Sequence, residues 1–233
     1  MTGKLIVIEG LDGSGKATQT KLLCQRLVDM SYEVLPLSFP NYKEPWSLFV
    51  KMYLNAEFGD KPEDVNPYAA SSFYAVDRFA SFNKNWKYYY TSGKIILCDR
   101  YTTSNAVYQL SKFKKKQWES YINWLCDYEY KKLGLPEPDL TFYLDVPLNI
   151  SQNLMLRRYQ GRENKKDLHE KSIKFLKSSK EAASFSAKLL GWKFVNCCND
   201  QGELRTTQSI NQEIFDKILN VICSKKETYE QKI

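Results

Sequence analysis

The chain lacks several features that define special classes of protein. None of its apolar runs approaches the roughly 20 residues that a membrane-spanning helix requires. It has one histidine, His169, and six scattered cysteines with no C-x-x-C pair, which argues against a zinc site and against a disulfide framework. The first residues lack the basic segment and long apolar stretch of a secretory signal. We therefore expect a cytoplasmic protein with no membrane partner.

The composition is that of a globular protein with an excess of positive charge. Its 233 residues suit a single domain spanning the chain, with 43% hydrophobic and 26% charged residues. A net charge of +7 attracts polyanions, including nucleotides and nucleic acid. The clearest basic run, at Lys112 and residues 114–116, is typical of a solvated helix entry. Because no nucleic-acid-binding motif accompanies it, we expect no nucleic-acid partner.

Short apolar runs alternate with helical patterns along the chain. The runs predict five strands, at residues 4–9, 33–38, 94–98, 140–144 and 194–196. Helical spacing predicts a helix from Thr18 and further helices at residues 69–86, 117–132 and 210–222, with two more flanking a polar segment at 157–166. This alternation predicts an α/β fold in which a parallel five-stranded sheet is flanked by helices on both faces, in three α/β/α layers. The charged tail, at about 224–233, is expected to fray.

A phosphate-binding loop follows the first predicted strand. Gly10-Leu-Asp-Gly-Ser-Gly-Lys16 fits G-x-x-x-x-G-K between a strand and a helix, which is the context that the motif requires. Its backbone N–H groups converge on phosphate oxygens, and the Lys16 ammonium neutralises the β- and γ-phosphates of ATP. The expected ATP-binding residues are Gly10, Asp12, Gly13, Ser14, Gly15, Lys16, Ala17 and Thr18.

One position of this loop departs from the usual pattern. Ala17 replaces the Ser or Thr whose hydroxyl binds Mg²⁺, and alanine cannot hold a metal. We expect Mg²⁺ to be held by Asp12 and Asp99, directly or through water. Asp99 ends the third predicted strand, and the adjacent Arg100 is suited to hold a phosphate with two hydrogen bonds.

Five motifs, in order over residues 4–222, resemble those of the thymidylate kinase family. They are the loop from Glu9 to Lys16, Phe39-Pro-Asn-Tyr42, Tyr74-Ala-Val-Asp-Arg78, Asp99-Arg-Tyr-x-x-Ser-Asn-x-x-Tyr108 and Pro138-Asp-Leu-Thr-Phe-Tyr-Leu-Asp145. The resemblance implies a P-loop kinase fold with a short mobile lid, and a homodimer. It also implies transfer of the ATP γ-phosphoryl group to dTMP, with Mg²⁺ as cofactor.

The family's roles fall on matching residues. The resemblance implies that Arg100 grips the dTMP phosphate, with Asp12 near metal and acceptor, and that Tyr74 stacks on the thymine ring. It implies that Arg78 hydrogen-bonds the edge of the base, and that Phe39 helps to close the thymine pocket. Asn105 and Tyr108 are expected to line the base and deoxyribose, with Tyr108 crowding the 2′ position.

The lid, at about residues 157–167, is expected to supply the catalytic cation. Gly13 and Ser14 of the loop are not basic, so the chain resembles the class of the family that carries this cation in the lid. The candidates are Arg157, Arg158 and Arg162, and the sequence does not separate them. Asp167 and Glu170 are expected to order the closed lid, and His169 to be a lid-facing or surface residue.

A second departure, at Asn41, leaves alternatives open. Many family members carry an arginine there that clamps the acceptor phosphate, and Lys43 offers only a point charge in exchange. The alternatives to a dTMP kinase are a related kinase acting on dUMP, UMP or a deoxynucleoside, and a nucleotide-binding regulator with weakened catalysis.

Overall fold

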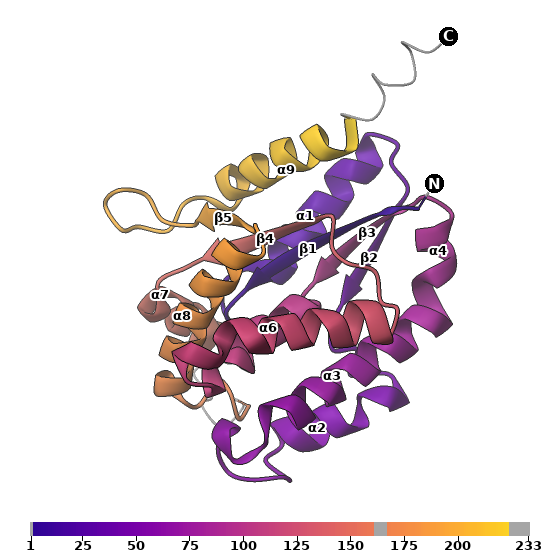
Figure 1. Cartoon of the computed structure of the whole chain (residues 1–233). Coiled ribbons are helices and arrows are strands. Elements are labelled where there is room, and N and C mark those ends of the chain that lie inside the picture. The colour runs from indigo at the N-terminus through magenta and orange to yellow at the C-terminus, as the bar shows by residue number, and fades with distance from the viewer. Residues whose placement is uncertain (1, 161–166, 224–233) are drawn as a thin grey trace.

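The computed structural model describes residues 2–160 and 167–223 (Figure 1). Its centre is one five-stranded sheet in the order β2-β3-β1-β4-β5, with every pairing parallel. The strands are β1 (Lys4–Gly10), β2 (Val34–Ser38), β3 (Ile95–Asp99), β4 (Leu140–Asp145) and β5 (Lys193–Asn196). All five strands predicted from the sequence are confirmed to within one residue at each end. Residues 161–166, which hold most of the predicted lid and Arg162, and the predicted tail lie outside the described residues.

Helices cover the sheet. The α-helices are α1 (Lys16–Asp29), α2 (Leu48–Leu54), α3 (Pro67–Ser81), α4 (Lys87–Thr91), α5 (Asn105–Tyr108), α6 (Trp118–Cys126), α7 (Leu148–Arg158), α8 (Ile173–Leu189) and α9 (Thr207–Cys223). In the described part of the chain, none of the helices has the length and apolarity to cross a membrane.

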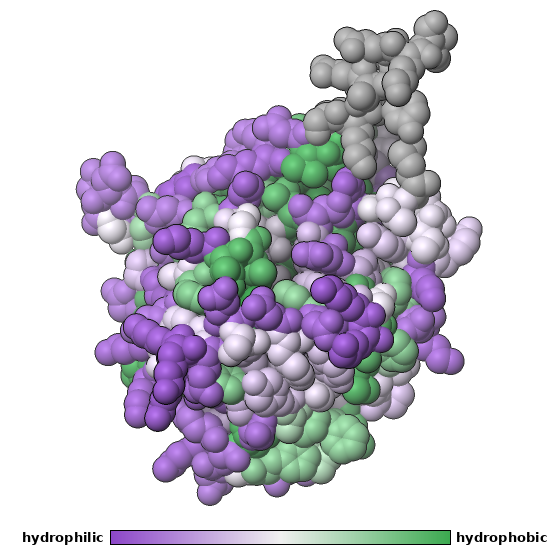
Figure 2. Space-filling model, in the orientation of Figure 1, coloured by the Kyte–Doolittle hydropathy of each residue, from purple (hydrophilic) through white to green (hydrophobic). Residues whose placement is uncertain are grey.

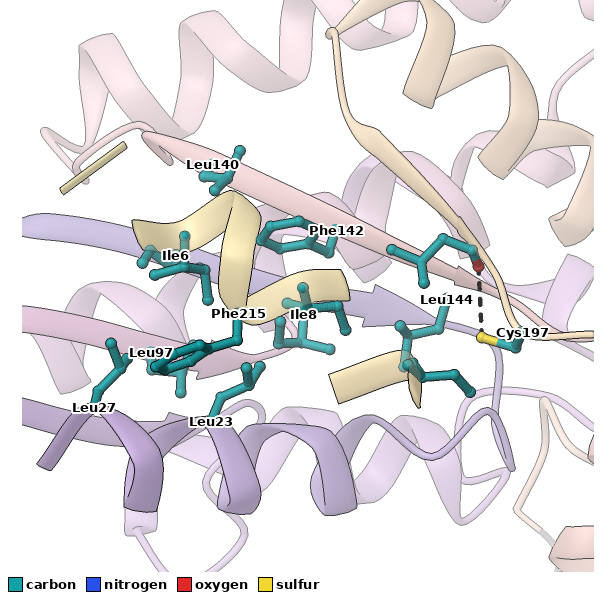
Figure 3. Close-up of a cluster of buried hydrophobic side chains, with 14 of the residues drawn as sticks. Ile6, Ile8, Leu23, Leu27, Leu97, Leu140, Phe142, Leu144, Cys197 and Phe215 are labelled. Atoms are coloured by element: carbon teal, nitrogen blue, oxygen red, sulfur yellow. Dashed lines mark hydrogen bonds between the residues drawn. The ribbon is translucent and has the colours of Figure 1, made fainter. Parts of the chain in front are cut away.

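The two faces of the sheet are buried against different helices. Successive side chains of a strand point to opposite faces, so Ile6 and Ile8 of β1 face one layer and Leu5 and Val7 the other. Figure 3 shows Leu23 and Leu27 of α1, with Phe215 of α9, packed against the first face. The segment that holds Phe82 and Trp86 covers part of the other face, and α8 packs on it against β4. The predicted three-layer α/β/α fold is therefore confirmed.

The long helix predicted at residues 69–86 is interrupted in the structure. The α-helix ends at Ser81, and residues 82–86 form a π-helical turn. This wider turn brings Phe82 and Trp86 into the core with ring centroids 4.5 Å apart. The same happens after α6, where residues 127–132 form a second π-helical turn that carries the buried Glu129. Apolar spacing alone does not separate π from α turns.

The order of the strands indicates that the site lies at the carboxyl ends of the strands, along one edge of the sheet. Chain order reverses beside β1, and ligands of open parallel sheets bind at such a point, outside the carboxyl ends of the strands. The loop before α1, the cis Phe39-Pro40 bond after β2 and Arg100 after β3 all lie at this edge.

Candidate active site

Two adjoining cavities lie at the carboxyl edge of the sheet. The larger, of about 1210 Å³ including open solvent, is the phosphate cleft; it is lined by Gly13, Gly15, Lys16, Ala17, Thr18, Asp99 and Arg158, among others. The smaller, of about 510 Å³, is the nucleoside pocket, and its lining includes Phe39, Tyr74, Arg78, Asn105, Tyr108 and His169. Asp12 and Arg100 line both.

The glycine loop between β1 and α1 requires glycine. Gly13 has φ 79°, and a Cβ there would lie 2.2 Å from the carbonyl oxygen of Ser151. Gly15, at φ 87°, directly precedes α1, whose first residue is Lys16. The Lys16 ammonium is buried and donates to the carbonyl oxygen of Leu11 at 2.9 Å. Burial lowers the pKa of Lys16, and the charge of Arg100 lowers it further.

Arg100 lies where the two cavities meet. Its backbone has φ 69°, a left-handed conformation that is uncommon outside glycine. Its Nη2 donates to Oδ1 of Asp12 at 2.5 Å, and the other carboxylate oxygen of Asp12 accepts from the Tyr108 hydroxyl at 2.9 Å. Burial favours the neutral carboxyl, but Arg100, Lys16 and the Tyr108 hydrogen bond outweigh it and lower the pKa of Asp12. Asp12 is therefore ionised in the site.

A buried carboxylate that sequence reasoning missed supports Arg100. Glu9 is fully buried at the end of β1, and its Oε1 lies 3.5 Å from Nη1 of Arg100. Its carboxylate also accepts from the hydroxyls of Thr103 and Ser104, each at 2.7 Å. The signal was present in the sequence, because an acid at the end of an apolar strand must find donors when buried.

A second buried carboxylate, Glu129, supports the nucleoside pocket. Arg78 is 1% exposed and donates to Glu129 through Nε at 2.7 Å and Nη2 at 2.5 Å. The amide of Asn105 donates to the same carboxylate at 3.1 Å and to the carbonyl oxygen of Ser71 at 3.2 Å. Both residues still line the pocket, and Glu129 fixes their orientation. Glu129 lies in the π-helical turn that sequence reasoning took for α-helix.

The lid that His169 was expected to face lies mostly outside the described residues, and the alternative, a surface position, was wrong for His169. It is 5% exposed, lines the nucleoside pocket, and its ring stacks on Tyr108 with centroids 5.3 Å apart. Lys112 also departs from expectation. Only residues 114–116 of its basic run are exposed, whereas the Lys112 ammonium is half-buried and donates to the Tyr53 hydroxyl at 2.9 Å.

The lid arginines differ in position. Arg158 lines the phosphate cleft, and its Nη2 donates to Glu170 at 3.1 Å. Arg157 is exposed and, within the described ranges, does not line the cleft. The carboxylate of Asp167 accepts from the backbone N–H groups of His169 and Glu170, both at 2.9 Å, and so shapes the turn beyond the predicted lid.

The site offers a fitting place for Mg²⁺. Oδ1 of Asp99 is buried and has no hydrogen-bond partner among the described residues, and Asp99 lines the cleft beside Lys16 and Ala17. In the ranges 2–160 and 167–223, no cluster of three His, Cys, Asp or Glu side chains could hold a metal. Protein Mg²⁺ sites commonly use one or two carboxylates together with substrate phosphates and water, so a single carboxylate beside a phosphate cleft is compatible with this ion.

In the loop after β2, neither Asn41 nor Lys43 takes the place of the arginine that could clamp the acceptor phosphate. The backbone N–H of Asn41 donates to Asp77 at 3.3 Å, and its side-chain oxygen accepts from the N–H of Lys43. Lys43 is exposed and lines neither cavity, whereas Tyr42 lines both.

Comparison with known proteins gives the family. The model of the family described as thymidylate kinase matches residues 8–210. The probable thymidylate kinase of Pyrococcus horikoshii is 33% identical over 151 residues, covering 65% of this chain and 69% of that protein. That of Thermococcus gammatolerans is 30% identical over 181 residues, covering 77% and 80%.

Solved structures agree on the fold. The thymidylate kinase from Candida albicans superposes with a TM-score of 0.67 at 23% identity, covering 94% of this chain and 92% of that one. The thymidylate kinase from Ehrlichia chaffeensis gives 0.65 at 20% identity, covering 94% and 100%. With the family model matching most of its length, the chain belongs to the thymidylate kinase family.

Proposed function

We propose that this chain transfers the γ-phosphoryl group of ATP to the phosphate of dTMP, giving dTDP for dTTP synthesis. The observation that carries the proposal is the pair of adjoining cavities, with Lys16 in one, Tyr74 in the other and Arg100 between them. A nucleotide whose base occupies the smaller cavity would bring its phosphate to Arg100, facing the larger. Two phosphates can then meet in line, as phosphoryl transfer requires.

The residues of the phosphate cleft hold and neutralise ATP. The N–H groups of the loop and the start of α1 bind phosphate oxygens, and Lys16 pairs with the β- and γ-phosphates. Asp99 would hold Mg²⁺, with Asp12 contributing through water, and the ion would neutralise charge on the phosphates. Of the two lid arginines that the structure describes, Arg158 is the better placed to reach the transferring group, because it lines the cleft and Arg157 does not. Arg162 lies outside the described residues.

The residues of the nucleoside pocket hold dTMP. Tyr74 stacks on the thymine ring, and Phe39 closes the pocket. Glu129 fixes Arg78, which presents a donor, and Asn105, whose amide hydrogens are used by Glu129 and Ser71 and whose side-chain oxygen can accept. Tyr108 crowds the 2′ position, and Arg100 grips the acceptor phosphate. That phosphate is already ionised, so the reaction needs positioning and charge neutralisation rather than a strong general base.

An ADP-release assay over dTMP, dUMP, UMP and thymidine, with Mg²⁺ and ATP, tests the proposal. We expect turnover to be highest with dTMP and to fall by several orders of magnitude in Lys16→Ala, with the fold retained by circular dichroism. The comparisons do not favour the other acceptors or a weakened regulator. Activity on UMP equal to that on dTMP would remove the role given to Tyr108.

We further propose a homodimer in the cytoplasm, with no nucleic-acid partner. Leu48 and Phe49 of α2 and Val76 and Phe79 of α3 are 42–53% exposed, and the two helices pack together through Phe49 and Phe73, with ring centroids 5.7 Å apart. Figure 2 shows apolar atoms gathered at the lower end of the molecule, over these helices. The unpaired cysteines, Cys24, Cys98, Cys126, Cys197 and Cys198, are compatible with a reducing compartment.

A further inference from the structure

His169 is held rigidly at the wall of the nucleoside pocket. Its ring stacks on Tyr108 with an interplanar angle of 13°, meets Tyr53 edge-on with centroids 5.3 Å apart, and packs on Phe175 at 4.8 Å. Its backbone N–H is tied to Asp167. With three aromatic contacts and an anchored backbone, the imidazole has one orientation.

A chain of hydrogen bonds links the ring of His169 to Tyr53 and Lys112. The Lys112 ammonium donates to the Tyr53 hydroxyl at 2.9 Å, and this hydroxyl lies 2.8 Å from Nε2 of His169. Burial lowers the pKa of Lys112 to about 7. Below that pH its ammonium can only donate, so the Tyr53 oxygen is the acceptor in the first bond. The hydroxyl hydrogen is then free to be donated to Nε2. When the hydroxyl donates to Nε2, the neutral ring carries its proton on Nδ1.

The ring stays neutral at physiological pH. Burial, followed by the charge of Lys112, lowers the pKa of His169 to about 3. Nδ1 has no hydrogen-bond partner in the described part of the chain, and the residue lines the nucleoside pocket but not the phosphate cleft. An uncharged, oriented N–H donor in this position matches an oxygen of the nucleoside rather than a phosphate.

We infer that the Nδ1–H of His169 donates a hydrogen bond to an oxygen of the nucleoside part of the acceptor nucleotide, and that Tyr53 and Lys112 are positioning residues that keep the proton on Nδ1. The inference rests on the proposed function, because it takes the smaller cavity to be the dTMP pocket. The oxygen is either a deoxyribose hydroxyl or a thymine carbonyl.

The single histidine of the chain makes the tautomer directly measurable. In protein labelled with ¹⁵N-histidine, we expect a protonated Nδ1 and an unprotonated Nε2, with no titration between pH 5 and 8. Adding dTMP without ATP shifts the Nδ1 resonance, and Tyr53→Phe or Lys112→Met mixes the tautomers. The inference is overturned if Nε2 is protonated in the wild type, or if the Nδ1 resonance does not shift when dTMP is added. Either result holds even if the enzyme phosphorylates dTMP.

Variants and analogues identify the acceptor oxygen. His169→Phe keeps a ring and removes the donor, so we expect the KM for dTMP to rise about 3- to 10-fold, the range of one neutral hydrogen bond, and the KM for ATP to stay within about twofold. His169→Asn, whose amide nitrogen can replace Nδ1, recovers part of the loss. If His169→Phe no longer raises the KM when the substrate is 3′-deoxy-dTMP, the hydrogen bond goes to the sugar hydroxyl. If it no longer raises the KM for 2-thio- or 4-thio-dTMP, the hydrogen bond goes to a carbonyl of the base.

Each failure has a separate meaning. If wild-type protein does not phosphorylate dTMP, the proposed function fails. If it does so and His169→Phe raises no KM, or the rise persists with every analogue, the hydrogen bond to the nucleoside is absent and the inference alone fails. Should His169→Phe not fold, the ¹⁵N measurement on wild-type protein still decides.

Discussion

At the scale of single residues, the site depends on two buried carboxylates that organise arginines. Glu9 lies beside Arg100 and Glu129 binds Arg78, and both carboxylates are fully buried. A buried charge is tolerated only when it is paired and hydrogen-bonded, because burying an unpaired charge costs free energy. Each of these two acids therefore stabilises the fold only while its arginine partner stays in place.

The Arg78–Glu129 pair gives the first prediction. Glu129→Gln leaves the Arg78 guanidinium buried without a counter-charge, and breaking a buried pair in this way costs about 3–5 kcal/mol. For a chain of this size that loss lowers the melting temperature by roughly 6–20 °C. The matched control is Glu181→Gln, whose pair with Lys115 is exposed on both sides and which we expect to change melting little. Equal melting of the two variants would contradict this account.

The Tyr108 hydroxyl gives the second prediction. Tyr108→Phe keeps the ring against the nucleoside but removes the donor to Asp12, a bond to a charged group worth about 1.5–3 kcal/mol. We expect kcat to fall by about 10- to 100-fold while preference for dTMP over UMP is kept. Tyr121→Phe, which removes a hydroxyl bound to Ser71 outside both cavities, is the control for loss of a buried hydroxyl.

At the scale of elements, the turn at residues 167–170 joins the two cavities. Asp167 and Glu170 line the phosphate cleft, and Asp167 and His169 the nucleoside pocket. Burial, followed by the charges of Asp12 and Glu170, raises the pKa of Asp167 from 3.8 to about 7. The folded chain therefore binds this proton more tightly than the unfolded chain does.

This raised pKa gives the third prediction. Between about pH 4 and 7 the folded state keeps a proton that the unfolded state has released, so the contribution of Asp167 to stability falls as pH rises through this window. Asp167→Asn keeps an oxygen that can accept from the two N–H groups but cannot ionise. We expect the difference in melting temperature between Asp167→Asn and the wild type to increase in favour of Asp167→Asn from pH 5 to pH 8. Asp200→Asn, on an exposed loop, should show no such trend.

Elements differ in how far the sequence predicts them. The central strands β1, β3 and β4 were predictable because each is a short apolar run that is buried on both faces, whereas β2 and β5 are only partly buried. The helix α2 was missed because its exposed Leu48 and Phe49 and buried Val50 and Tyr53 give no clear stripe. Helix α1 was predictable from its apolar spacing, although only Leu23 and Leu27 are fully buried, whereas Leu22 and Val28 flank the buried stripe and are exposed.

The site was predictable only where a motif carries it. Lys16, Asp99 and Arg100 could be named because they follow strands in a recognisable pattern. Glu129 and His169 could not, because each reaches the site from a distant segment through tertiary packing, and neither belongs to a local pattern. Lys112 looked like a member of a solvated run, and only the fold brings its ammonium to Tyr53.

At the scale of the whole molecule, the exposed apolar side chains of α2 and α3 bear on assembly. Val76 and Phe79 lie three residues apart on α3 and so share one face of the helix, next to the buried Ala75 and Arg78. Exposed apolar side chains gathered on two packed helices are typical of an interface.

This surface gives the fourth prediction. We expect light scattering to give the wild type twice the 27.3 kDa mass of one chain, and Phe79→Asp combined with Val76→Asp to give the mass of a single chain. Each aspartate would place an unpaired charge in the interface, whereas in the monomer it points to water at no comparable cost. Tyr88→Asp is the control, because Tyr88 of α4 is 75% exposed and lies outside these two helices. A single-chain mass for the wild type, or a dimer in the double variant with unchanged dissociation, would show that α3 does not form the interface.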